Sequence, residues 1–326
     1  MSFDRREWLQ AAGGLGASLA LPSWAQTKPW PQRAVRFVVP FAPGGSSEII
    51  ARATAFELTK SLGQTVYVEN KPGAAGNLAM QEVARSDDQH TLILGHIGTL
   101  AVNPYMFDRL PYDPNKDFKP VSLLAKVPSL YLVHPELPVK NLREFVDYVK
   151  KRPGQLSYGS AGNGSAGHLA MEYLKMATDT FIVHVPYRGT GPQLTDLLAG
   201  RLQAASVGAA AVIQFVRTGR LRCIATGTLQ RLPQLPDVAT VAEQGWPGFE
   251  MTQWYGILGP ANLPQAAVDT LAIASTSAVK QPATNEKFST DAVIGMGGGP
   301  AEFARFIAQE QQRWKPVVER ARIKPD

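Results

Sequence analysis

Short apolar segments alternate with helix-like segments along most of this chain, and this order restricts its possible folds more than any other feature. The predicted strands cover residues 34–40, 65–69, 91–95, 155–160, 181–186, 202–207, 221–226 and 254–260, and residues 121–133 form a longer apolar segment. The predicted helices cover residues 47–62, 142–151, 165–176, 192–199, 265–279 and 301–320. Repeated strand–helix–strand units build parallel sheets with helices on both faces, so we expect an α/β fold.

Two lobes suit this pattern better than one. The chain has 326 residues, which is enough for two hydrophobic cores of common size. Each half also opens in the same way, with a strand, a glycine-rich loop and a helix, at residues 39–47 and 158–165. We therefore expect two mostly parallel sheets, each flanked by helices.

The first 25 residues have the layout of an export signal. A charged segment with Arg5 and Arg6 is followed by a short apolar stretch at 11–21 and by the small residues Ser23 and Ala25 on either side of a tryptophan. The paired arginines resemble a twin-arginine signal, with an ordinary secretory signal as the alternative. Because no later apolar segment is long enough to cross a bilayer, the mature protein is not expected to be membrane-embedded.

Each glycine-rich loop joins a strand to a helix, and this combination provides donors for an anion. Glycines allow a sharp turn that exposes backbone N–H groups. The first turn of a helix adds unpaired N–H groups and a partial positive charge. Ser46 or Ser47, and Ser165, are suitable N-caps for the helices that follow. Two matched loops at the C-terminal ends of strands predict that one anion is held between them.

Motifs for catalysis, cofactors and metals are missing or incomplete. Residues 162–167 match the dinucleotide pattern G-x-G-x-x-G, but the next strand does not end in the Asp or Glu that would hold a ribose. An NAD-linked enzyme that uses this loop remains an alternative. The sequence contains no G-x-S-x-G, Walker-lysine or H-E-x-x-H motif. Its net charge of +6 comes from scattered Lys and Arg residues, which is not typical of nucleic-acid binding. We expect neither an enzyme nor a bound cofactor or metal.

Several separated motifs resemble the Bug family, the TctC-like periplasmic binding components of tripartite tricarboxylate transporters. They are VPFAPGGS at 39–46, VENKPGAAG at 68–76, PYDP at 111–114 with DF at 117–118, YGSAGNGSAGH at 158–168, PYRG at 186–189, DLLAG at 196–200, PDV at 236–238 and WYG at 254–256. The resemblance runs from about residue 30 to residue 314.

This resemblance implies a type II-like clamshell that captures a small carboxylate between its lobes. Its implied divisions are a signal at 1–25, lobe 1 at 26–128, lobe 2 at 129–250 and a return to lobe 1 at 251–326. The implied ligand-binding residues are Phe41, Gly44, Gly45, Ser46, Thr99, Ser160, Gly162, Asn163, Gly164, Ser165, Tyr187 and Arg188. The protein would be a periplasmic monomer whose partners are membrane transporter subunits. A sensor that presents the carboxylate to a membrane signalling protein is the alternative function.

The sequence departs from the family pattern at a few positions. Glu48 stands where the family usually has Asp, Gln203 where an acid is usual, and Ala239 where proline is common. Residues 206–210 are unusually small and apolar. These differences predict a roomier or less polar pocket and leave the identity of the carboxylate open.

Overall fold

Strands and helices alternate as the sequence predicts. The computed structural model describes residues 29–324, so the predicted signal at 1–25 lies outside the described residues. The strands are β1 (Val35–Val39), β2 (Val66–Asn70), β3 (Thr91–His96), β4 (Phe118–Val133), β5 (Ser157–Ser160), β6 (Val183–Pro186), β7 (Ala204–Gly208), β8 (Arg222–Thr226), β9 (Thr252–Pro260) and β10 (Ile294–Gly295). The helices are α2 (Ser46–Leu62), α3 (Asn77–Ala84), α4 (Asn103–Met106), α5 (Leu142–Lys150), α6 (Ala166–Thr178), α7 (Thr190–Leu198), α8 (Ala209–Arg217), α9 (Gln265–Lys280), α10 (Pro282–Thr290) and α11 (Pro300–Ala321), with short turns at η1 (Ala74–Gly76) and η2 (Gly98–Val102).

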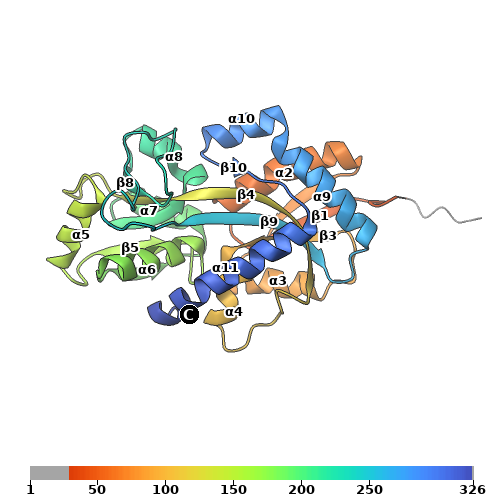
Figure 1. Cartoon of the computed structure of the whole chain (residues 1–326), viewed down its shortest axis with the longest axis horizontal. Helices are drawn as coiled ribbons and strands as arrows, with labels where there is room; N and C mark the ends of the chain where they lie inside the picture. Colours follow the sequence, from red (N-terminus) through yellow and green to blue (C-terminus); the bar gives the residue numbers. More distant parts are fainter. Residues whose placement is uncertain (1–28, 325–326) are drawn as a thin grey trace, which may run out of the picture.

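The strands follow the order β2-β1-β3-β9-β4-β7-β5-β6, and β8 and β10 also pair with β4. Strand β1 is parallel to β2 and β3, and β5 is parallel to β6 and β7. The central pairs β3–β9, β9–β4 and β4–β7 are antiparallel. The α/β class is confirmed, but the sheet is mixed rather than mostly parallel. The reason is that the chain crosses the molecule along β4 and returns along β9 in the opposite direction (Figure 1).

The 16-residue strand β4 changes its partner part-way along its length. Its residues up to Pro128 pair with β9, and its residues from Ser129 onward pair with β7. Pro128 has no N–H group and cannot donate to a ladder, which suits a point where pairing changes. One continuous strand therefore connects the two halves of the sheet.

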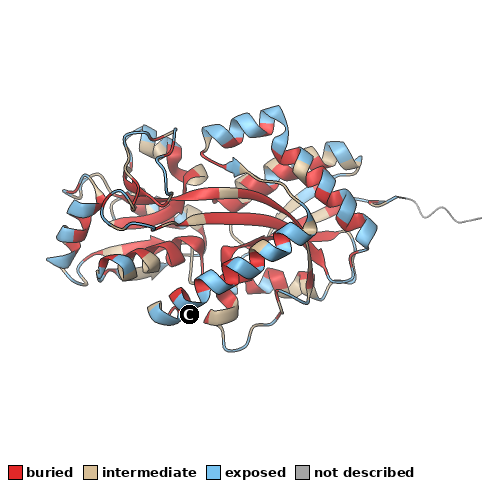
Figure 2. Ribbon diagram, viewed as in Figure 1, coloured by how far each residue is buried: buried red, intermediate tan, exposed pale blue. Residues whose placement is uncertain are grey.

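Helices cover both faces of the sheet, and each face has its own hydrophobic core. Alternate residues along a strand point to opposite faces, so Phe37 and Leu92 join one core while Val38 and Ile93 join the other. Helices α2, α8 and α9 pack on the first face, and α3, α6 and α11 on the second (Figure 1). The long central strands are almost entirely buried, while the outer helix faces are exposed (Figure 2).

Four helices within residues 29–324, α3, α4, α8 and α10, were not predicted from the sequence. Helix α8 begins directly after the last residue of β7, with no polar loop between them, so one small apolar run contains both elements. Within the described residues, no helix combines the length and apolarity needed to cross a membrane.

Candidate functional site

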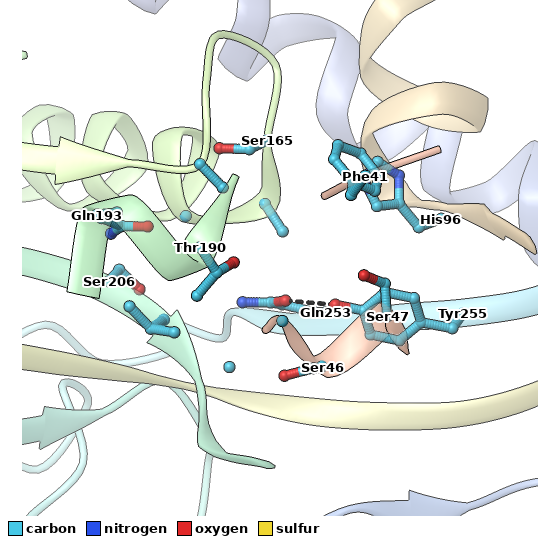
Figure 3. Close-up of a pocket in the computed structure, with 16 residues that line it drawn as sticks. Phe41, Ser46, Ser47, His96, Ser165, Thr190, Gln193, Ser206, Gln253 and Tyr255 are labelled. Atoms are coloured by element: carbon cyan, nitrogen blue, oxygen red, sulfur yellow. Dashed lines mark hydrogen bonds between the residues drawn. The ribbon is translucent and has the colours of Figure 1, made fainter. Parts of the chain in front are cut away.

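Four helix N-termini meet around one small, partly enclosed cavity, called here the inner cavity. Its volume is about 40 Å3, enough for a few water molecules. The N-termini belong to α2 from the first half of the chain and to α6, α7 and α8 from the second (Figure 3). The lining residues are Phe41, Gly45, Ser46, Ser47, His96, Ala161, Ser165, Ala166, Gly167, Thr190, Gln193, Ser206, Val207, Gly208, Gln253 and Tyr255.

The first glycine-rich loop directs the start of α2 at the cavity. The N-cap of α2 is Gly45, not Ser46 or Ser47 as expected, and no side chain caps this helix. Both serines lie inside the first turn because Gly44, at φ 96°, turns the chain one step earlier. The N–H of Gly44 donates to Glu48 Oε2 at 2.8 Å, so this glycine does not offer its donor to a ligand. The first-turn N–H groups of Ser46 and Ser47 are left to face the cavity.

The second glycine-rich loop uses most of its own donors internally. Gly162 N–H donates to Ser160 Oγ at 3.1 Å, and Gly164 N–H donates to His168 Nδ1 at 3.2 Å. Ser165 is the N-cap of α6, as expected, and its Oγ accepts from His168 N–H. The backbone donors that this segment offers to the cavity are therefore the first helical residues, Ala166 and Gly167, rather than the loop glycines.

The N-termini of α7 and α8 complete the cavity, and neither was predicted to provide backbone donors. Their N-caps are Gly189 and Gly208, and neither helix has a side-chain cap. Both follow the same order of strand, glycine and helix as the two predicted loops. In the sequence, residues 186–190 and the apolar run 204–209 have this order of strand, glycine and helix.

Polar side chains also face the cavity. The hydroxyls of Ser46 and Ser206 are buried and have no hydrogen-bond partner among the described residues. The phenol of Tyr255 donates to Gln253 Oε1 at 2.7 Å, which leaves the Gln253 NH2 group pointing away from Tyr255 and into the cavity (Figure 3). The Gln193 amide offers an acceptor instead of a donor, because its Nε2 donates to the Gly159 carbonyl at 2.9 Å and its oxygen has no such bond. Unsatisfied buried hydroxyls are costly, and those of Ser46 and Ser206 border the cavity, where a ligand can bond them.

The inner cavity has no formal charge near neutral pH. Within residues 29–324, its lining includes no Lys, Arg, Asp or Glu. Burial lowers the pKa of His96 to about 4, and burial also raises the pKa of Tyr255, so both side chains stay neutral. The same part of the chain contains no group of three or more His, Cys, Asp or Glu side chains able to hold a metal ion. Only helix dipoles, N–H groups and hydroxyls are available to bind an anion here.

A larger outer pocket of about 460 Å3 lies on the other side of Phe41 and Ala161, which line both spaces. Of the predicted site residues, Phe41, Gly45, Ser46 and Ser165 line the inner cavity. Phe41, Gly162, Asn163, Tyr187 and Arg188 line the outer pocket. Arg188 is exposed there, and Tyr187 donates its hydroxyl to Asp196 at 2.7 Å. The structure therefore divides the predicted site between two compartments.

The other predicted residues line neither space and support their neighbours instead. Thr99 is fully buried, and its N–H donates to His96 Nδ1 at 3.0 Å, which fixes the His96 ring against Phe41. Ser160 Oγ bonds His184 Nε2 at 2.7 Å beneath the second loop. Gly164 lies against α4, where an added β-carbon would be 2.9 Å from Asn103 Oδ1. Gln203 is also remote, because its side chain accepts from Ser157.

Two stacked histidines support the second loop from below. The rings of His168 and His184 are parallel within 6°, with centroids 4.0 Å apart. Burial lowers the pKa of His168 to about 4, assisted by Lys175. Burial, followed by the proximity of His168, lowers the pKa of His184 to about 3. Both rings are therefore neutral near pH 7. This agrees with the hydrogen bond from Gly164 N–H, because Nδ1 of His168 can accept it only without a proton.

Comparison with known proteins identifies the family. The model of the tripartite tricarboxylate transporter family receptor, TctC, matches residues 50–323. The chain belongs to this TctC family. The match covers most of the chain and includes all of α6, α7 and α8 and the part of α2 from residue 50 onward. The resemblance noted in the sequence is thereby confirmed.

Solved structures of TctC-type proteins have the same fold. The periplasmic binding protein BugD has a TM-score of 0.87 and 31% identity, covering 90% of this chain and 100% of its own. R. palustris Rpa4515 with adipate has a TM-score of 0.87 and 34% identity, covering 90% and 99%. MatC from Rhodopseudomonas palustris with bound malate has a TM-score of 0.85 and 34% identity, covering 89% and 100%. This chain is thus similar to periplasmic solute-binding proteins, two of which are described with carboxylates.

Proposed function

We propose that this protein is a periplasmic solute-binding protein that captures a small carboxylate for uptake by a tripartite tricarboxylate-type transporter. The observation that carries this proposal is the inner cavity. Four uncapped or partly capped helix N-termini and two unpartnered hydroxyls face a space whose described lining has no charged side chain. The adipate and malate described for two similar structures agree with a carboxylate ligand.

Hydrogen bonds from the chain are sufficient for useful affinity. A hydrogen bond to a charged group contributes about 1.5–3 kcal/mol, so the N–H groups of Ser46, Ser47, Ala166 and Gly167 together supply about 6–12 kcal/mol before the cost of ordering the ligand. Micromolar binding requires about 8 kcal/mol. These bonds are stronger in a largely buried cavity than in bulk water, because the local dielectric is lower.

Lobe closure belongs to the same proposal. Lobe 1 would comprise residues 26–128 and 251–326, and lobe 2 residues 129–250. The change of partner along β4 between Pro128 and Ser129 supports this division. Since α2 would belong to lobe 1 and α6, α7 and α8 to lobe 2, a carboxylate held by all four would favour the closed arrangement.

A thermal-shift screen against monocarboxylates, dicarboxylates and tricarboxylates tests the proposal. A ligand present at 100 times its Kd stabilises a protein by about 2.7 kcal/mol, which corresponds to a rise in Tm of about 5 °C for a chain of this size. Ser206→Ala should reduce this rise, whereas Ser277→Ala, at an exposed position on α9, should not. If no carboxylate shifts Tm and calorimetry detects no heat of binding, the proposed function is wrong. Deleting the protein should also abolish uptake of the identified carboxylate; retained uptake with lost gene induction would instead indicate a sensor.

A further inference from the structure

The outer pocket borders the inner cavity and is formed by both halves of the chain. The first half contributes residues 40–42 and 72–76, and the second half contributes residues 161–163 and 187–189. Phe41 and Ala161 line both spaces and therefore separate them. Under the proposed division of the chain, the two sets of residues belong to different lobes. Parting the lobes would open a path from the outer pocket into the inner cavity.

Arg188 is the only charged residue in the lining of the outer pocket, within the part of the chain that the structure describes. Its side chain is exposed and forms no ion pair with any residue in the range 29–324. Two acids on neighbouring segments already have cationic partners. Asp196 pairs with Arg201 at 2.7 Å, and Glu48 pairs with Arg52 at 2.7 Å. The positive charge of Arg188 is therefore left to act on a ligand.

Arg188 is close enough to the inner cavity to attract an anion that approaches it. Two peptide units separate Arg188 from Thr190, which lines the cavity, so their Cα atoms lie within about 8 Å of each other. This distance is about the Debye length at physiological ionic strength, so the attraction is only partly screened. The described lining of the inner cavity has no charged side chain, and the effect of a helix end falls off within about one turn. A formal charge beside the cavity therefore extends the range of the attraction.

We propose that the outer pocket is the path by which the carboxylate enters the inner cavity, and that Arg188 accelerates its capture without contacting it in the bound state. This proposal rests on the proposed function, since it concerns how the same site is filled. A charge at the rim of a site acts mainly on the association rate constant and on its salt dependence. Because Arg188 does not hold the bound ligand, its removal should lower the association and dissociation rate constants by similar factors and change the Kd less than three-fold.

Stopped-flow mixing with succinate tests the proposal, or with the tightest-binding carboxylate of the thermal-shift screen if succinate does not bind. Trp314 on α11 packs against Tyr173 on α6, with ring centroids 5.5 Å apart, so tryptophan fluorescence can report lobe closure. At about 0.01 M salt, Arg188→Ala should lower the association rate constant about 3-fold to 10-fold, and Arg188→Lys should retain it. Arg188→Glu changes the charge twice as much, so its loss should be about the square of the loss in Arg188→Ala. At about 1 M salt, where the Debye length is about 3 Å, these losses should disappear.

Arg320→Ala is the matched control, because Arg320 is exposed on α11, lines neither space and carries the same charge. It should leave the association rate constant unchanged. An unchanged association rate constant in Arg188→Ala would overturn the proposal, as would a loss that persists at about 1 M salt. A Kd more than three-fold higher through faster dissociation would show that Arg188 holds the bound carboxylate, and would also overturn it. These outcomes leave carboxylate binding intact, whereas the absence of binding by every carboxylate of the screen would overturn the proposed function itself.

Discussion

The variant Gly208→Ala should destabilise the closed arrangement without adding or removing a polar group. Gly208 has φ −62° and ψ 136°, which alanine adopts without strain. In the structure, however, an added β-carbon would lie 2.5 Å from Ser46 Oγ, and 3.1 Å from both Gln253 Oε1 and Val127 Cγ1. Because α8 and α2 would belong to different lobes, the main clash arises when they come together.

The expected cost follows from this geometry. Contacts between a β-carbon and oxygen are seldom shorter than about 3 Å, so the two helices must separate or the Ser46 hydroxyl must turn away. Overpacking of this kind costs about 1–3 kcal/mol. The lower figure applies if Ser46 changes rotamer, and the higher one if the backbone moves. The Kd for the carboxylate should therefore rise about 5-fold to 150-fold, since the binding-competent state becomes less populated.

A double-mutant cycle with Ser46→Ala measures this clash by calorimetry. Removing the hydroxyl also removes a ligand donor, so Ser46→Ala alone should weaken binding. The double variant should lose less binding free energy than the sum of the losses in the two single variants, with a coupling energy of at least about 1 kcal/mol. Gly299→Ala is the matched control, because φ is −87° there and no atom lies within 4 Å of the added β-carbon. Additive effects, or unchanged affinity in Gly208→Ala, would refute the reasoning.

Three further predictions concern pH, the outer pocket and export. The pKa values of His168 and His184 are lowered in the folded protein, so between about pH 6.5 and pH 4 the unfolded chain binds protons that the folded chain does not. The free energy of unfolding should therefore fall as pH falls through this range, by up to about 1.4 kcal/mol per pH unit for each ring. Thermal melts at pH 7, 6 and 5 should show a shallower decline in a His168→Asn, His184→Asn double variant, and an equal decline would contradict this assignment. Arg188→Ala should change the Kd less than three-fold, whereas Ser206→Ala should raise it at least five-fold, about 1 kcal/mol; the reverse order in calorimetry would place the carboxylate in the outer pocket. Replacing Arg5 and Arg6 with lysine should leave precursor in the cytoplasm on fractionation, and normal processing in the periplasm would show that export does not depend on the arginine pair.

Local sequence patterns predict much of this fold. The β-branched strand 34–40, the helix 47–62 and the N-cap Ser165 appear in the structure close to where the residues indicate. Pairing between distant strands is harder to predict, because it depends on contacts between segments far apart in the chain. Nothing local in residues 118–133 reveals that one strand crosses the whole molecule and exchanges β9 for β7 at Pro128.

The candidate site shows the same limit. Glycine-rich loops pointed to α2 and α6, because a strand, a glycine loop and a helix can be recognised within ten residues. Gln253 and Ser206 reach the cavity from strands β9 and β7, and only tertiary structure brings them beside Ser46. The sequence also could not show that the N–H groups of Gly44 and Gly164 already donate to Glu48 and His168. The N–H groups left for a ligand are therefore those of the first helical turns.

A crystal structure of the protein with succinate tests the central claim most directly. We predict that one carboxylate occupies the inner cavity, within hydrogen-bond distance of N–H groups from the first turns of both α2 and α6 and of the Ser206 hydroxyl. No charged side chain should contact it. A carboxylate bound instead to Arg188 in the outer pocket, with the inner cavity filled only by water, would contradict this account.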